Sequence, residues 1–265
     1  MPTVREGAFA PSLPYADRVR QVGFDQPFRW VAAGARDLIA APVASVCYGL
    51  LFVLAGYGLT FALWRVHSIY MLLPLASGFM LLAPALTLGF QAISRDLEQH
   101  RKPSLPRALF AWQTNPGSIF YAGLALVFLF LVWFRLAQLL FALSFPATAE
   151  LDVQGLVDAT FFTADGLIFL AFFLALGAGV AALAFAGGAV ALPMLLDRRV
   201  GMAEAIATSF TAVMLNLRTM ALWAAILVAL TAVGMAAFYI GLAITLPIAG
   251  HATWHAYRAM VAPEG

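Results

Sequence analysis

The stretch from Arg218 to Arg258, RTMALWAAILVALTAVGMAAFYIGLAITLPIAGHATWHAYR, contains no aspartate, glutamate, lysine or arginine between its two ends. As a single helix it would extend about 60 Å, roughly twice the thickness of the hydrocarbon core of a bilayer. Two antiparallel helices that turn near MAAFYIG (residues 235–241) fit the bilayer instead. We therefore predict two membrane spans here, at about 219–236 and 239–257.

Four more apolar runs long enough to cross a bilayer precede this stretch. They lie at about 43–63, 69–93, 118–143 and 167–193. The chain of 265 residues is 63% hydrophobic and only 11% charged, whereas soluble domains carry about 25% charged residues. The sequence predicts an all-α integral membrane protein with a six-span helix bundle. Its main partner is the lipid bilayer, and we expect no nucleic-acid partner.

The lysines and arginines predict how these spans are oriented. Of the 15 basic residues, all but Arg65 and Arg135 lie before an odd-numbered span or after an even-numbered one. Basic residues accumulate on the cytoplasmic side of a membrane. We therefore expect a multi-pass protein with both termini in the cytoplasm.

A short amphipathic stretch precedes each odd-numbered span, at about 25–39, 104–112 and 202–217. In the first stretch, Phe28 and Ile39 belong to the apolar face and Asp37 to the polar face. Such helices lie in the headgroup layer with the apolar face towards the lipid. The pattern predicts three pseudo-repeats, each a cytoplasmic amphipathic helix followed by a transmembrane hairpin.

The same pattern suggests how the domain is bounded and where its helices bend. The even-numbered spans carry Pro84, Pro193 and Pro247 towards their cytoplasmic ends, where a missing backbone hydrogen bond bends or ends a helix. Residues 1–24 are polar and proline-rich, and we expect a disordered cytoplasmic tail there. Residues 25–262 then form a single transmembrane domain.

Two histidines, His251 and His255, lie four residues apart, on one face of a helix. Neutral imidazoles bind haem iron, copper and other metal ions. Two histidines alone are an incomplete metal site, however; a protein zinc site, for example, requires three or four ligands. The simpler interpretation is a polar helix end at the headgroups, shared with Trp254, Tyr257 and Arg258. A proton or headgroup contact is a third interpretation. We expect no cofactor, and keep haem or copper on His251 and His255 as the alternative.

Arg135 is the one charged residue inside a predicted span, beside Trp133 in the outer leaflet. An arginine there either extends its guanidinium group to the membrane interface or closes a polar pocket. The pocket would pair Arg135 with Gln138 and with Asp152 or Asp158 of the outer loop. No predicted span contains a carboxylate, which argues against a proton-coupled pump.

The fourth predicted span is rich in small residues at a spacing that allows close helix contact. These are Gly177 with Ala181, Ala178 with Ala182, and Ala186. We interpret this helix as central in its own bundle, although a contact with another chain would leave the same pattern. Asp165 is expected to cap the start of this helix.

Four motifs resemble a family of proteobacterial inner-membrane proteins known as domain of unknown function 2189. They are NPGS (115–118), WFRLAQLLFAL (133–143), LPMLLDRRV (192–200) and GHATWHAYR (250–258). The resemblance extends over about 25–260 and implies a place in the bacterial inner membrane. Some members are labelled cytochrome c oxidase subunit I. That label implies a bundle of twelve spans with six histidine ligands, whereas this chain offers six predicted spans and one histidine pair. From that label we retain only an association with respiratory complexes.

The sequence contains none of the common catalytic motifs, and we expect no enzymatic activity. The leading hypothesis is an accessory subunit, scaffold or assembly protein that binds another membrane protein or itself. A transporter of small solutes or lipids is the first alternative, and it requires a cavity reached by Arg135, Gln138 or Gln91. Haem or copper binding is the second.

Overall fold

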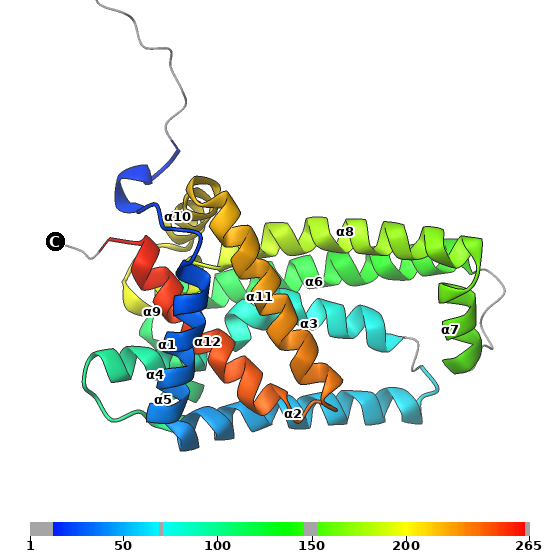
Figure 1. Ribbon diagram of the computed structural model, residues 1–265, viewed down its shortest axis with the longest axis horizontal. Coiled ribbons are helices and arrows are strands. Elements are labelled where there is room, and N and C mark those ends of the chain that lie inside the picture. Colours follow the sequence, from blue (N-terminus) through cyan, green and yellow to red (C-terminus); the bar gives the residue numbers. More distant parts are fainter. Residues whose placement is uncertain (1–12, 69–70, 146–152, 263–265) are drawn as a thin grey trace, which may run out of the picture.

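The computed structural model describes residues 13–68, 71–145 and 153–262, and every structural statement below concerns these residues. They contain helices joined by turns and no β-strand (Figure 1). The helices are η1 Ala16–Arg18, α1 Gln26–Ala40, α2 Pro42–Arg65, α3 Leu72–Leu86, α4 Leu88–Glu98, α5 Leu105–Leu109, η3 Ala111–Thr114, α6 Pro116–Ser144, α7 Val153–Phe161, α8 Ala164–Gly188, α9 Ala191–Asp197, α10 Met202–Leu215, α11 Leu217–Ala236 and α12 Leu242–Met260.

Five helical segments in the described residues are long and apolar enough to cross a membrane. They are α2, α3 with α4 (Pro74–Glu98), α6, α8 with α9 (Ala164–Asp197), and α11. The all-α membrane class is therefore confirmed. The sixth predicted span corresponds to α12, whose polar C-terminal half keeps it outside this set.

The long helices α2, α3, α6 and α8 run side by side along the long axis of the molecule (Figure 1). At one end α1 crosses this direction, and α10 gathers there with α9, while α7 lies at the opposite end. The hairpin of α11 and α12 is tilted against the other helices. Helix α12 packs most extensively on α1, and also on α2, α11 and α4. We call the end of the molecule where α1, α9, α10 and α12 meet the crowded end, and it is built around α12.

Prolines occur where the return helices change direction. Pro84 lies just before Thr87, where α3 ends and α4 begins, and Pro193 lies in the first turn of α9. Proline lacks the N–H that a continuous helix requires. The segments after these breaks, α4 and α9, are mostly buried, as is the half of α12 that follows Pro247.

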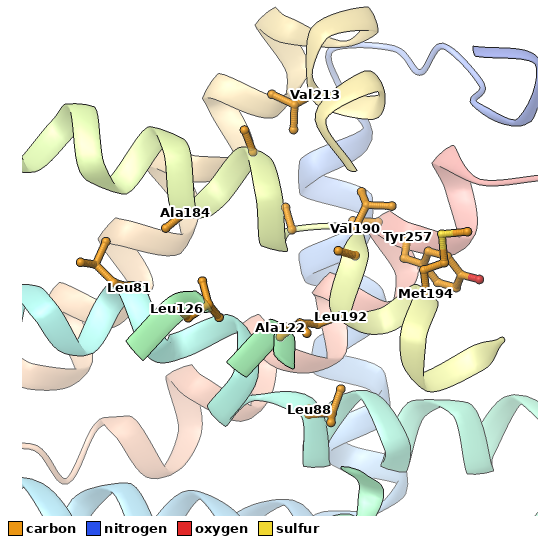
Figure 2. Close-up of a cluster of buried hydrophobic side chains, with 14 of the residues drawn as sticks. Leu81, Leu88, Ala122, Leu126, Ala184, Val190, Leu192, Met194, Val213 and Tyr257 are labelled. Carbon is orange, nitrogen blue, oxygen red and sulfur yellow. The ribbon is translucent and has the colours of Figure 1, made fainter. Parts of the chain in front are cut away.

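The main hydrophobic core lies where these segments meet. Figure 2 shows part of it, with side chains from α3, α4, α6, α8, α9, α10 and α12 converging. Val190, Met194 and Tyr257 are fully buried there. The rings of Trp30 (α1) and Trp223 (α11) meet edge to face at 5.6 Å, so the same core extends under α1. The protein is densely packed at this end.

Two predictions about α8 are wrong. The cap is Thr163, whose hydroxyl accepts a hydrogen bond from the Gly166 N–H at 3.0 Å, while Asp165 lies in the first helical turn. Nor is α8 central in the bundle. It packs on α6 through aromatic rings, with Trp133 and Phe173 4.8 Å apart, and Gly177 faces the same Trp133 ring.

The small residues of α8 consequently divide between two environments. Ala178, Ala181 and Ala182 are exposed on the outer surface of the helix, and Ala186 is buried at the crowded end. Because the large rings fill the contact between α6 and α8, the small side chains are left facing outwards.

The N-terminal segment departs from the predicted disorder. Residues 1–12 lie outside the described chain, but residues 13–24 pack against α10 and the end of α12. The Arg20 N–H donates to the Met260 carbonyl at 2.7 Å, and the Val22 N–H donates to the Asn216 side chain at 2.8 Å. These hydrogen bonds order a polar segment that has no helical periodicity.

Candidate functional site

Five polar side chains from four helices form a hydrogen-bonded chain in the crowded end, which we call the histidine network. They are Asp37 (α1), Ser45 (α2), Ser94 (α4), and His251 and His255 (α12). His251 contacts Ser45 Oγ through Nε2 at 2.9 Å and Ser94 Oγ through Nδ1 at 2.8 Å. Asp37 Oδ2 lies 2.6 Å from Ser94 Oγ and 2.8 Å from His255 Nε2.

The direction of each hydrogen bond follows from the chemistry of the partners. Ser94 donates its only hydroxyl proton to Asp37, so it accepts a hydrogen bond from His251 Nδ1–H. His251 Nε2 is then the acceptor for the Ser45 hydroxyl. His251 is thereby held as one neutral tautomer, with both ring nitrogens engaged.

The network runs from the surface into the interior. The His255 side chain is 32% exposed and that of Asp37 is 17% exposed, whereas Ser45 and His251 are completely buried. Buried polar groups are costly unless they are hydrogen-bonded. Because each of these groups has its partner, the network ties α1, α2 and α4 to α12.

Close helix contact brings the network together. A Cβ atom at Gly34 of α1 would lie 2.5 Å from the carbonyl oxygen of Ile248 and 2.7 Å from the amide nitrogen of Ala252. Only glycine allows α1 to approach the backbone of α12 this closely. The helical period then carries Asp37, three residues beyond Gly34, to the histidine face.

A second set of polar residues, the carboxylate network, joins α4, α9 and α12. Glu98 accepts a hydrogen bond from Trp254 Nε1 at 2.8 Å and forms an ion pair with Arg258 at 2.8 Å. Asp197 accepts a hydrogen bond from the Tyr257 hydroxyl at 2.7 Å and lies 3.5 Å from Arg258. The two networks together hold the three buried return segments against one another.

The environment predicted for the end of α12 is therefore wrong in part. His251, Trp254 and Tyr257 are 0–1% exposed and do not lie at a headgroup surface. His255 and Arg258 retain partial exposure. The reason is that α1 and α4 cover the polar face of α12, which sequence periodicity cannot distinguish from a face in contact with water.

The ring nitrogens of His251 and His255 are not arranged to bind haem iron or copper. Both nitrogens of His251 are engaged by serine hydroxyls, and His255 Nε2 is engaged by Asp37. Among the described residues, no three His, Cys, Asp or Glu side chains are placed to hold a metal ion. A metal would have to displace hydrogen bonds that the fold already satisfies.

Arg135 and Gln138 do not join this site. Arg135 is exposed on α6 and its guanidinium lies 3.4 Å from the Gln138 side-chain oxygen. Of the two predicted acidic partners, Asp158 accepts a hydrogen bond from Gln154, and Asp152 lies outside the described residues. Gln91 is fully buried on α4. None of these residues lines the pocket at the end of α4 or the pocket between α6, α8 and α10.

Sequence reasoning missed Asp37, Ser45 and Ser94 as members of the site. The amphipathic pattern assigns Asp37 to the polar face, but Asp37 is largely covered and continues a strip along α1 that begins with the buried residues Trp30 and Gly34. Phe28 and Ile39, on the predicted apolar face, are exposed at the molecular surface. The usable signal was the i, i+4, i+7 spacing of one tryptophan, one glycine and one aspartate.

The Asp37 carboxyl group has a perturbed acidity. Burial disfavours its charged form, but hydrogen bonds from His255 and Ser94 outweigh this effect and lower the pKa of Asp37 below its ordinary value. Ionised Asp37 therefore stabilises the folded state at pH values above about 4, the pKa of an unfolded aspartate. This contribution is lost as the pH falls through the lower folded pKa.

We accordingly expect Asp37→Asn to destabilise the protein at neutral pH and to have a smaller effect in acid. Unfolding of the wild type and the variant in mild detergent, measured at pH 7 and near pH 3, checks this. The difference in unfolding free energy should shrink at the lower pH. An equal difference at both pH values would show that the Asp37 charge does not contribute.

Comparison with known proteins agrees with the class that the fold defines, an all-helical integral membrane protein. Within that class, residues 72–197, from α3 to α9, match the family described as "Predicted integral membrane protein (DUF2189)". The resemblance inferred from the motifs is thus confirmed for this segment, whereas GHATWHAYR lies outside it. No curated protein and no solved structure matches the chain.

Proposed function

We propose that this protein is a non-enzymatic accessory or assembly protein of the bacterial inner membrane. In this proposal α12 forms a sixth crossing, and the crowded end with α1 and α10 faces the cytoplasm. The order of a short helix, a long helix and a proline-containing return helix recurs three times along the chain, with the return helix broken in the first two cases and continuous in α12, and this order supports the three pseudo-repeats.

The observation that carries the proposal is the contrast between the two ends of the molecule. In the most apolar stretches of α2, α6 and α8, only 17% of the residues are buried within the protein, against 50% for α3 with α4. The crowded end is held by the two polar networks. The outer parts of the long helices therefore offer their side chains to lipid or to another membrane protein.

Helix α8 offers a surface suited to a protein partner. Ala178 and Ala182 are exposed one turn apart, and a Cβ atom at the neighbouring Gly179 would meet nothing within 4 Å. Small residues at this spacing let the backbones of two helices approach closely and gain dispersion energy that lipid chains do not provide. A second membrane protein is thus the preferred occupant, and respiratory complexes are the first partners to examine.

The test is a double substitution, Ala178→Leu with Ala182→Leu, which adds bulk to this face without entering the core. We expect any protein that co-purifies stoichiometrically in mild detergent to be lost, or its recovery to fall about tenfold, equivalent to about 1.4 kcal/mol. Quantitative mass spectrometry of the purified complex measures this.

The matched control is Leu176→Phe, which adds bulk at an exposed position of α8 about half a turn from Ala178. It should leave co-purification unchanged. A wild-type protein that purifies alone, without self-association, would contradict the proposal. So would a double variant that retains its partner.

A further inference from the structure

We propose that the pocket between the end of α4, α5 and η3 binds the phosphate of an anionic phospholipid headgroup. The pocket has a volume of about 440 Å³. Arg95, Arg101 and Arg107 line it, together with Asp96, Phe110 and Gln113. It is separate from the outer surface of α8, so this inference does not depend on the accessory role and shares with the proposed function only the cytoplasmic position of the crowded end.

The charges of the lining favour an anion. Three arginines line the pocket against a single aspartate. Asp96 is nearly buried and forms ion pairs with Arg101 at 3.0 Å and Arg107 at 3.5 Å. One carboxylate cannot neutralise three guanidinium groups, and planar guanidinium groups bind phosphate oxygens in pairs.

Arg95 has donor capacity that the protein does not use. One of its terminal nitrogens donates to the Leu196 carbonyl, which fixes the side chain against α9. Its Nε is buried and has no hydrogen-bond partner among the described residues. A buried N–H without an acceptor is unfavourable, so the Arg95 guanidinium, which lines the pocket, is not fully satisfied by the protein and favours an additional acceptor.

Arg107, which also lines the pocket, is already held by hydrogen bonds. Its Nε lies 3.2 Å from Ser104 Oγ, and its guanidinium also donates to the Lys102 carbonyl. These contacts restrain a long side chain before a ligand arrives, which reduces the entropy lost on binding. The pocket lining therefore combines two arginines that the protein already holds by hydrogen bonds, Arg95 and Arg107, with Arg101.

The surroundings favour a lipid over a free phosphate ion. Phe110 forms part of the wall, and Leu109, Phe110 and Trp112 are exposed on the adjoining surface of α5 and η3. Aromatic side chains of this kind lie at the boundary between headgroups and acyl chains. Basic pockets near the cytoplasmic ends of membrane helices bind anionic headgroups. Acyl chains could therefore leave the pocket along this apolar surface.

The experiment is native mass spectrometry of the full chain in a mild detergent with three probes. These are dioleoylphosphatidylglycerol, dioleoylphosphatidylcholine and inorganic phosphate. We expect retention of phosphatidylglycerol over phosphatidylcholine, and about a fivefold or greater loss of that retention in Arg101→Gln and in Arg107→Gln, as for removal of a charge-assisted hydrogen bond. Each variant leaves Asp96 with one arginine partner.

Arg29→Gln is the matched control, because Arg29 is an exposed arginine on α1 that pairs only with the exposed Asp25 among described residues. It should bind phosphatidylglycerol as the wild type does. Thermal unfolding of each variant verifies that it is folded. Equal retention of both lipids, or retention unchanged in the two pocket variants, overturns the proposal. If the protein binds inorganic phosphate, the pocket variants lose this binding and neither lipid is preferred, the ligand is a free phosphate ion and not a lipid headgroup.

Discussion

Replacement of His251 by leucine is expected to lower the free energy of unfolding by about 3 kcal/mol. Leucine has a similar volume, so the loss arises from hydrogen bonding and not from a cavity. Without the imidazole, the completely buried Ser45 hydroxyl loses its acceptor, and Ser94 Oγ loses the donor that faces it. Chemical unfolding in mild detergent, followed by circular dichroism, measures the change.

A double variant separates the hydrogen bonds of His251 from other effects of the substitution. Ser45→Ala with His251→Leu removes the orphaned hydroxyl together with its partner. Since a buried polar group costs most when only one partner is removed, the double variant should regain about 1 kcal/mol relative to His251→Leu alone. If the single variant unfolds at the wild-type denaturant concentration, the histidine network does not hold the crowded end together.

Substitution of Gly34 by alanine is expected to separate α1 from α12. The added methyl group would meet two backbone atoms of α12 at 2.5 and 2.7 Å, and neither can rotate away. Overpacking of this kind typically costs about 1–3 kcal/mol, and we expect a value near the upper end. Hydrogen–deuterium exchange should show faster exchange across α1, along with a lower unfolding free energy.

Gly123→Ala is the control, because the same substitution is expected to leave the unfolding free energy unchanged or to raise it. Gly123 lies within α6, and a Cβ atom there would meet nothing within 4 Å. Alanine is favoured over glycine in a helix interior by about 1 kcal/mol, so this variant should be unchanged or slightly more stable. Similar losses in both variants would mean that flexibility, and not the close approach at Gly34, explains the effect.

The sequence predicts the long helices well, because apolar length and flanking charges act locally. The predicted runs at 43–63 and 118–143 correspond to α2 and α6, which begin one and two residues earlier, at Pro42 and Pro116. The run at 69–93 covers two helices, since Pro84 marks a break that average hydropathy does not register.

The candidate site was predictable only in part. Helical spacing correctly placed His251 and His255 on one face, and both contact the Asp37–Ser94 pair. Their depth was not predictable, because a polar helix end has the same pattern whether it faces headgroups or another polar helix. Which helix covers it depends on packing between distant segments, which one sequence does not specify.

The pairing of α1 with α12 also determines when the protein can complete its fold during synthesis. Asp37 and His255 are 218 residues apart. At the usual rate of translation this separation corresponds to roughly 10–40 s. Throughout that interval the strip of α1 lacks α12, the helix on which it packs most extensively, so α1 must wait at the membrane surface or be shielded by another protein. Biogenesis of this chain should therefore be sensitive to anything that delays or removes α12.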